Sequence, residues 1–168
     1  VPPKGYFKRL REICDKHGIL LIFDEVITGW GRTGYPFAAQ AFGVTPDIMT
    51  MAKAVTNGVV PLGAVASREN IYDTVLDASP MGAVEFFHGY TYSAIPVSMA
   101  AGLAMQNIIE KENLFQRSKD MSPYFLDGLF SLKDIDVITD IRGYGMMGGI
   151  DIRFDERPGK AGYTCFKK

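Results

Sequence analysis

The sequence is poor in the features that mark several large classes of protein. Its two cysteines lie far apart in 168 residues, which favours a reducing compartment and no disulfide. The 18 basic and 19 acidic residues are interspersed and leave a net charge of −1, so we expect no charged surface for nucleic acid or an anionic membrane. No apolar run approaches the roughly 20 residues that span a bilayer. We therefore expect a cytoplasmic protein with neither nucleic acid nor membrane as a partner.

Motifs for metal and nucleotide binding are also missing. The two histidines, Cys14 and Cys165 show no metal-ligand spacing, so we expect no metal centre. No Gly-x-x-x-x-Gly-Lys-Ser/Thr phosphate loop is present, because the nearest candidate, ending in Gly159–Lys160, has Phe154 at the first glycine position. The first residue is Val1 rather than methionine, and we expect the chain to be part of a longer polypeptide.

What is present is an ordinary globular composition, 47% hydrophobic and 22% charged, with ample material for a core. Apolar patterning predicts the alternating helices and strands of an α/β fold. We expect strands at 19–24, 46–52, 61–67, 137–143 and 145–153, and helices at 4–17, 68–77 and 96–114, followed by a helical stretch that Pro123 interrupts or begins. Ser67 is expected to cap the helix at 68–77. A charged run near 111–120 predicts a boundary between two subdomains, 1–112 and 113–168.

The stretch LLIFDEVITGWGRTG, residues 20–34, places two acids at the end of an apolar run. Leu20–Phe23 is too short for a helix and predicts a strand that is buried on both faces. Ligands of open α/β sheets bind beyond the carboxyl ends of the parallel strands, where Asp24 and Glu25 follow. A carboxylate at that position can hold a cation, a metal ion or a protonated ring nitrogen.

Lys53 likewise follows an apolar segment, DIMTM, and its neighbours are apolar rather than charged. Its side chain either extends along apolar surface to reach solvent or is partly desolvated, which would favour a neutral amine that attacks carbonyl groups. A carboxylate and a lysine at the ends of two strands of one sheet together suit pyridoxal 5'-phosphate. The lysine would form the Schiff base, and Asp24 would keep the ring nitrogen protonated.

A different enzyme class remains open for the same residues. An apolar strand followed by Asp-Glu is also typical of Mg²⁺-dependent nucleotide hydrolases, in which Asp24 would support the metal ion and Glu25 would activate water. The missing phosphate loop weakens this alternative without excluding it.

Three ordered motifs, IFDEVITGWGRTG, GVTPDIMTMAKAVTNGVVPLGAV and FFHGYTYSAIP, resemble those of the class III (ω-type) aminotransferases. The resemblance runs nearly end to end, and EFFHGYTYS and IRGYGMMGGIDIRFDERPGKAGY are most similar to the ω-amino acid:pyruvate (β-alanine:pyruvate) branch. It implies the aspartate-aminotransferase fold (fold type I), with 1–112 as part of the large pyridoxal-phosphate domain and 113–168 as the start of the C-terminal α+β domain. It further implies transamination of an ω-amino acid or amine with pyruvate, in a homodimer or a dimer of dimers.

The resemblance also implies roles for individual residues. Asp24 should pair with the pyridinium nitrogen. Val26, two residues further on and on the same side of an extended chain, should pack against the cofactor ring. Lys53 should be the Schiff-base lysine and should also move the proton during the reaction. Thr91 should bind the cofactor phosphate of the opposite subunit, with Tyr90 lining the substrate pocket nearby.

A non-catalytic relative or a dimerisation module that keeps the fold is the second alternative to an aminotransferase. We also expect residues 1–168 to be inactive alone.

Overall fold

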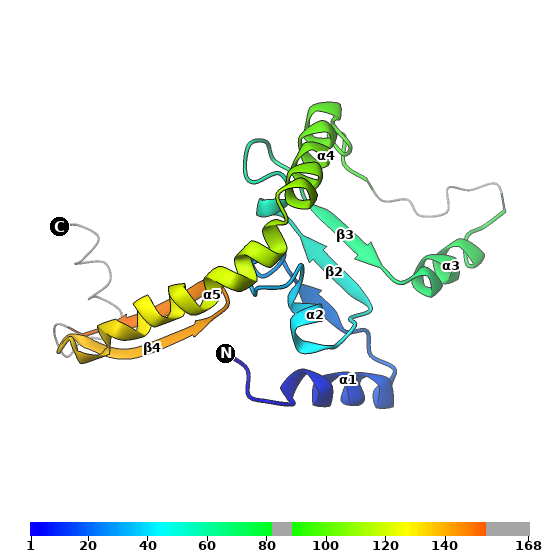
Figure 1. Ribbon diagram of the computed structural model, residues 1–168. Coiled ribbons are helices and arrows are strands. Elements are labelled where there is room, and N and C mark those ends of the chain that lie inside the picture. Colours follow the sequence, from blue (N-terminus) through cyan, green and yellow to red (C-terminus); the bar gives the residue numbers. More distant parts are fainter. Residues whose placement is uncertain (82–88, 154–168) are drawn as a thin grey trace.

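The computed structural model describes residues 1–81 and 89–153. At its centre lies a three-stranded sheet in the order β1 (Ile22–Asp24), β2 (Ile48–Met51) and β3 (Ala64–Ser67) (Figure 1). β1 pairs with β2 in parallel, and β3 runs antiparallel to β2. The motif residues in 82–88 and the residues in 154–168, including Cys165, lie outside the described part.

Helices lie before, between and after these strands. They are α1 (Tyr6–His17), α2 (Ala38–Phe42), α3 (Glu69–Asp77), α4 (Pro96–Lys111) and α5 (Leu114–Phe130), with short 3₁₀ helices η1 (Lys53–Val55) and η2 (Ser131–Asp134). α2 was not among the helices expected from the sequence. β4 (Ile138–Tyr144) and β5 (Met147–Ile152) form an antiparallel hairpin that extends with α5 to one side of the central sheet (Figure 1). The subdomain boundary at 112/113 falls between α4 and α5 and stays a prediction. No helix in the two described ranges is both long enough and apolar enough to cross a membrane.

β1 differs from its expected form in length and in burial. It begins at Ile22 rather than at residue 19, and the prediction of a strand buried on both faces is wrong. Phe23 is buried and lies against Phe7 of α1, with 5.2 Å between the ring centres. Ile22, which points to the opposite face, is 55% exposed. The physical reason is that α1 covers one face of the strand only.

Two boundary expectations are also wrong. Ser67 does not cap α3, because the helix begins at Glu69 with Arg68 at the N-cap and without a side-chain capping bond. Pro123 neither interrupts nor begins a helix and lies inside the continuous α5. A proline removes one helical hydrogen bond, and α5 keeps its form because Phe125 and Leu129, one helical turn apart, pack at Gly148 of the hairpin.

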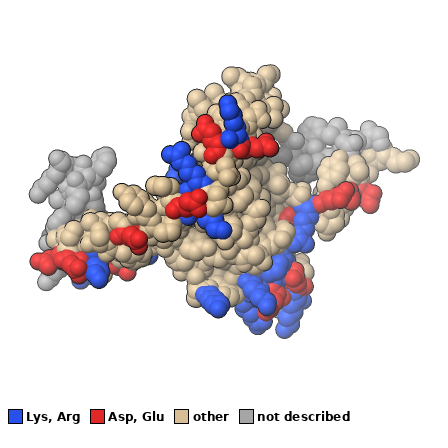
Figure 2. All heavy atoms as spheres, viewed as in Figure 1, with Lys and Arg blue, Asp and Glu red and all other residues tan. Residues whose placement is uncertain are grey.

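The hydrophobic core is small and lies between α1, β1 and α2. Its members are Cys14, Leu21, Phe23 and Val44, with Phe7, Leu10 and Ala39 packed around them. Much of the remaining apolar material stays exposed, including Val65 at 70% and Leu103 at 67%. On the face drawn in Figure 2, charged side chains of both signs intermingle, and a broad uncharged area lies at its centre. The apolar composition is therefore ample, but only part of it is buried within the described residues.

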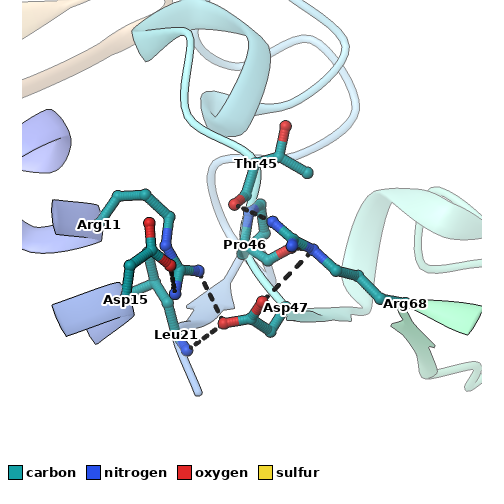
Figure 3. A network of polar contacts seen from close by, with 7 residues as sticks. All are labelled: Arg11, Asp15, Leu21, Thr45, Pro46, Asp47 and Arg68. Atoms are coloured by element: carbon teal, nitrogen blue, oxygen red, sulfur yellow. Dashed lines mark hydrogen bonds and ion pairs between the residues drawn. The ribbon is translucent and has the colours of Figure 1, made fainter. Parts of the chain in front are cut away.

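A polar network holds together the ends of the strands opposite the carboxyl edge (Figure 3). Its centre is Asp47, just before β2, whose carboxylate accepts hydrogen bonds of 2.7 Å from both the Leu21 N–H and Arg11 of α1. Arg68, at the start of α3, lies 3.3 Å from the same carboxylate. Burial raises the pKa of Asp47, but the Leu21 N–H and the Arg11 guanidinium outweigh it and the pKa is lowered overall. Asp47 thus joins two helices and two strands through one charge.

We expect Asp47→Asn to lower the free energy of unfolding by about 2 kcal/mol near neutral pH, because hydrogen bonds to a charged group are lost. The lowered pKa means that this stabilisation is present above the usual aspartate pKa and is lost as the pH falls through the folded-state value. Urea unfolding of both proteins at neutral and at acidic pH measures the difference, which should shrink in acid. Asp15→Asn is the control: Asp15 is 65% exposed and pairs with Arg11 on the same helix, so it should cost at most about 0.5 kcal/mol. Equal losses for the two variants would contradict the central place of Asp47.

The glycine-rich turn after β1 is in close contact with the β4–β5 hairpin. The Met146 N–H donates to the Arg32 carbonyl at 2.8 Å, and the Ser118 hydroxyl of α5 donates to the Gly31 carbonyl. Gly145, in the turn between β4 and β5, has a φ of +60°, and a Cβ added there would lie 2.5 Å from the Arg32 oxygen. The loop that follows Asp24 is thereby fixed against the second half of the chain.

Gly145→Ala should destabilise the protein by about 2–4 kcal/mol, because it combines left-handed strain with overlap against the backbone of the glycine-rich turn. Gly18→Ala is a matched control: Gly18 has a φ of +63°, and nothing lies within 4 Å of an added Cβ. The control should lose only about 1–2 kcal/mol, the cost of the left-handed conformation. Thermal or urea unfolding measures both, and equal losses would contradict the close contact between turn and hairpin.

Candidate active site

Asp24 and Lys53 emerge at the same edge of the central sheet. In the parallel pair, Asp24 lies opposite Thr50, and the Glu25 N–H continues the ladder by donating to the Thr50 carbonyl at 2.9 Å. Lys53 follows three residues after Thr50, beyond the end of β2. Because β1 and β2 are parallel, both residues follow the carboxyl ends of their strands and lie at the same edge of the sheet. Neighbouring strands are about 4.8 Å apart. This is the juxtaposition that the sequence predicts.

Asp24 is held by the turn that it begins. One of its carboxylate oxygens, Oδ1, accepts the Val26 N–H at 3.0 Å, and the residue remains exposed. β1 ends at Asp24, so the expectation that Val26 shares a face with Asp24 on an extended chain is wrong. Val26 is half-buried and lies in the turn that follows the strand. The other carboxylate oxygen of Asp24 makes no hydrogen bond within residues 1–81 and 89–153.

The neighbouring acid, Glu25, has a different environment. It is 1% exposed, and its carboxylate accepts the N–H groups of Ala38 and Ala39 at 2.9 and 2.8 Å and the Thr28 hydroxyl. It therefore satisfies the first amides of α2 and is not available to activate water. The nucleotide-hydrolase alternative needs Glu25 for that task, so the geometry speaks against it. Within residues 1–81 and 89–153, no group of acids, histidines and cysteines has the arrangement of a metal site.

Lys53 is the first residue of η1 and has a left-handed backbone, with a φ of +49°. Its carbonyl accepts the Gly58 N–H at 3.1 Å, which closes a tight loop around the lysine. The residue is exposed, so the desolvated environment considered for it is not present within the described residues. Its amine is accessible to a carbonyl compound from solvent.

Thr91 and Tyr90 lie elsewhere, in the loop before α4. Tyr90 is 76% exposed, and Thr91 is exposed as well. The loop is closed locally by the Ser93 N–H, which donates to the Tyr90 carbonyl at 2.9 Å, and the Ser93 hydroxyl accepts the Tyr90 N–H at 3.2 Å. Neither residue lines the cavity that opens beside β1 and Asp24, between α1 and the hairpin. Both side chains are displayed on the surface of the chain.

A cavity of about 480 Å³ opens beside β1, between α1 and the hairpin. It is mostly apolar, and its polar lining includes Asp24, Thr33 and Arg142. The Arg142 guanidinium forms ion pairs with Asp140 and Asp151, and the pKa of Arg142 is raised by these bonds, that from Asp151 first. Lys53 does not line this cavity. Of the two residues expected to form the site, only Asp24 therefore lines the cavity.

The chain belongs to the class III aminotransferases: the family model for aminotransferase class III matches residues 1–164. This family is dependent on pyridoxal phosphate. Among its relatives is the β-alanine–pyruvate aminotransferase of Pseudomonas aeruginosa, 56% identical over 90% of this chain and 34% of its own length. The ω-aminotransferase of Caulobacter vibrioides is 52% identical over 95% of this chain and 36% of its length. The chain therefore spans about a third of the length of these relatives.

Solved structures lead to the same family. An (S)-enantioselective ω-transaminase from Thermomicrobium roseum is 40% identical, with a TM-score of 0.85 over 93% of this chain and 34% of that chain. The chain thus has the fold of part of a fold-type-I transaminase. The α/β class and the family that the motifs predict are confirmed.

The donor set at the carboxyl edge fits the cofactor of this family. Asp24 offers a carboxylate with one oxygen fixed by the Val26 N–H, and Lys53 offers an exposed primary amine just beyond the end of the adjacent strand β2. A carboxylate suits a protonated pyridine nitrogen, and an amine suits an aldehyde. The residues present are therefore chemically matched to pyridoxal phosphate.

Sequence reasoning missed three residues that shape the sheet and the loops around it. Glu25 was expected at the ligand-binding edge together with Asp24. Adjacent residues of an extended chain point to opposite faces, and this alternation could have indicated that the two acids have different environments. Asp47 follows Pro46 directly before a strand, where a short acid often bonds nearby backbone. Thr56 stands among apolar residues and glycines, and no pattern indicated that its side chain would be fully buried.

Proposed function

We propose that residues 1–168 form part of the large domain and the start of the C-terminal domain of a pyridoxal-phosphate-dependent aminotransferase that transfers the amino group of an ω-amino acid or amine to pyruvate. The observation that carries this proposal is the register of β1 and β2, which brings Asp24 and Lys53 to one edge of the sheet. The substrate class is supported by relatives whose names specify β-alanine–pyruvate and ω-amino acid–pyruvate aminotransferases. The subdomain division at 112/113 and a cytoplasmic location belong to the same proposal.

Each site residue has a defined task in this proposal. Asp24 would hold a proton on the ring nitrogen of the cofactor, and Val26 would pack against the ring. Lys53 would bind the aldehyde carbon covalently through its amine; once released, it would take a proton from the substrate carbon and deliver it to C4′. The protonated ring would supply the electron-withdrawing group that makes this proton acidic. Tyr90 would line the substrate pocket.

A homodimer or a dimer of dimers is part of the proposal, because Thr91 is assigned to the cofactor phosphate of the opposite subunit. Its exposure on the loop before α4 suits a residue that acts across an interface. The exposed apolar side chains of α4, among them Val97 and Leu103, would be covered in such an assembly. A hydroxyl group is a suitable donor to a phosphate oxygen.

Subunit mixing should reveal whether Thr91 acts in trans. We expect Lys53→Ala and Thr91→Ala homodimers to be impaired, whereas a mixed dimer contains one site with both defects and one with neither. Mixing the two variants should therefore restore up to about half of the activity per heterodimer, as shared sites require. Transamination is measured before and after exchange of subunits. If mixing restores nothing, Thr91 acts within its own subunit or not at all.

Covalent trapping tests the proposed function directly. The complete polypeptide that carries residues 1–168 is incubated with pyridoxal phosphate, reduced with borohydride and digested, and the peptides are analysed by mass spectrometry. We expect the adduct on Lys53, together with formation of alanine from pyruvate when β-alanine is supplied. A protein without an adduct at Lys53 and without transamination would instead be the non-catalytic relative or dimerisation module. Mg²⁺-dependent hydrolysis of ATP would support the nucleotide-hydrolase alternative.

A further inference from the structure

Lys53 has a backbone conformation that a lysine seldom adopts. Its φ of +49° lies in the left-handed region, which is costly for residues other than glycine. Asn57, with a φ of +52°, and Gly58, with a φ of +76°, have the same hand within five residues. Such conformations persist only where the surrounding structure holds them in place. The loop after β2 must therefore contain interactions that keep Lys53 in this state.

Thr56 supplies the central interaction. It is 1% exposed, and its hydroxyl donates to the Val60 carbonyl at 2.6 Å across the loop. The backbone N–H of Thr56 approaches the Lys53 carbonyl at 3.4 Å, and the Gly58 N–H donates to the same carbonyl at 3.1 Å. One buried hydroxyl thus joins the two arms of a loop whose first residue is the lysine.

The far arm of this loop is fixed to α4, which lies next to η1 (Figure 1). Ser98 of α4 is 5% exposed, and its hydroxyl donates to the Pro61 carbonyl at 3.0 Å. Gly102, one turn further along, faces Leu62, and an added Cβ would lie 3.2 Å from its side chain. Thr56 therefore connects Lys53 to a segment that is itself held by a helix.

We propose that Thr56 is a positioning residue for Lys53. Its hydroxyl keeps the Lys53–Val60 loop closed and the lysine left-handed, which sets the direction in which the amine leaves the edge of the sheet. Without this hydroxyl, the carbonyl of the half-buried Val60 loses its partner and the loop relaxes toward ordinary backbone angles. The amine then points toward its reaction partner for a smaller fraction of the time. This inference rests on the proposed function only in assigning a reaction to Lys53.

A matched pair of variants isolates the hydroxyl. Thr56→Val keeps the shape of the side chain and removes the donor, whereas Thr56→Ser keeps the donor and removes a methyl group. In the complete polypeptide, the first readout is hydrogen exchange at the Gly58 amide, which needs no cofactor. The second is the rate at which Lys53 is captured by pyridoxal phosphate and borohydride, and the third is kcat compared with KM.

In Thr56→Val, we expect the protection of the Gly58 amide from hydrogen exchange and the rate of Lys53 capture each to fall about tenfold. This is the size of effect that the loss of one hydrogen bond produces. The loss in activity should appear in kcat rather than in KM, and Thr56→Ser should stay within about twofold of the unsubstituted protein in all three readouts. Unchanged Gly58 protection and Lys53 capture in the valine variant, or equal losses in the serine variant, would overturn the proposal. If the valine variant does not fold, Ser98→Ala, which releases the same loop from α4, decides by the same criteria.

The two proposals fail in different ways. If the unsubstituted protein shows no capture at Lys53, the assignment of the lysine is wrong, while Gly58 exchange still decides the role of Thr56. If Lys53 is captured normally in every Thr56 variant and Gly58 exchange is unchanged, only the positioning role is wrong.

Discussion

Lys53→Ala should abolish transamination in the complete polypeptide, with a loss greater than about 10⁴-fold. General acid–base catalysis alone contributes about 10²–10⁴-fold, and the variant removes both the proton-moving amine and the covalent attachment. The expected effect is chemical rather than structural. Lys53 is exposed, and alanine has no greater preference than lysine for a φ of +49°. The cofactor could still bind noncovalently. The variant should therefore retain absorbance from bound cofactor while it loses transamination activity.

The measurement is the rate of alanine formation from β-alanine and pyruvate, together with the melting temperature of each variant. Lys111→Ala is a suitable control, because Lys111 is an exposed lysine at the end of α4. This control should keep full activity. Transamination by Lys53→Ala within tenfold of the unsubstituted protein would remove Lys53 from the mechanism.

Asp24→Asn should leave the fold intact and lower kcat by about 100-fold or more. The amide oxygen of asparagine can still accept the Val26 N–H, so the turn after β1 is retained. A neutral amide no longer favours the protonated ring nitrogen, and each unit of lowered pKa at that nitrogen corresponds to about 1.4 kcal/mol. Two such units give a loss of about 100-fold.

The adjacent acid, Glu25, provides a control, because its substitution should lower stability, whereas Asp24→Asn should lower kcat. Glu25→Gln places an amide NH₂ group among the N–H donors of Ala38 and Ala39 and the Thr28 hydroxyl, so we expect a loss of stability. Steady-state kinetics and urea unfolding of both variants separate the two effects. If Asp24→Asn proved unstable while its kcat stayed normal, Asp24 would be a structural residue like its neighbour.

Several features of this protein were predictable because they depend on short-range pattern. The apolar runs before Asp24 and Lys53 are local, and in a parallel pair they place both residues at the same edge without further information. The helix α1, ending at Gly18 in a left-handed cap, and the start of α4 at Pro96 were predictable for the same reason. The motifs that indicate the family are likewise contiguous in sequence.

The features that could not be predicted depend on contacts between distant segments. Glu25 has its role because the first amides of α2, 13 and 14 residues later, lie within reach of its carboxylate. Pro123 stays inside a helix because α5 packs against the hairpin, and Ile22 is exposed because only one face of β1 is covered. Local propensity carries no information on any of these partners.

The sequence by itself indicated the α/β class through its apolar periodicity and the family through the resemblance of its motifs, and it placed Asp24 and Lys53 directly after two apolar runs. The tertiary structure alone decided how each side chain is used. It left Asp24 exposed and buried Glu25, although the two residues are adjacent in the sequence. It also twisted Lys53 into a left-handed loop closed by Thr56. The physical reason is that burial, hydrogen-bond partners and backbone strain arise only when segments far apart in the chain are packed together.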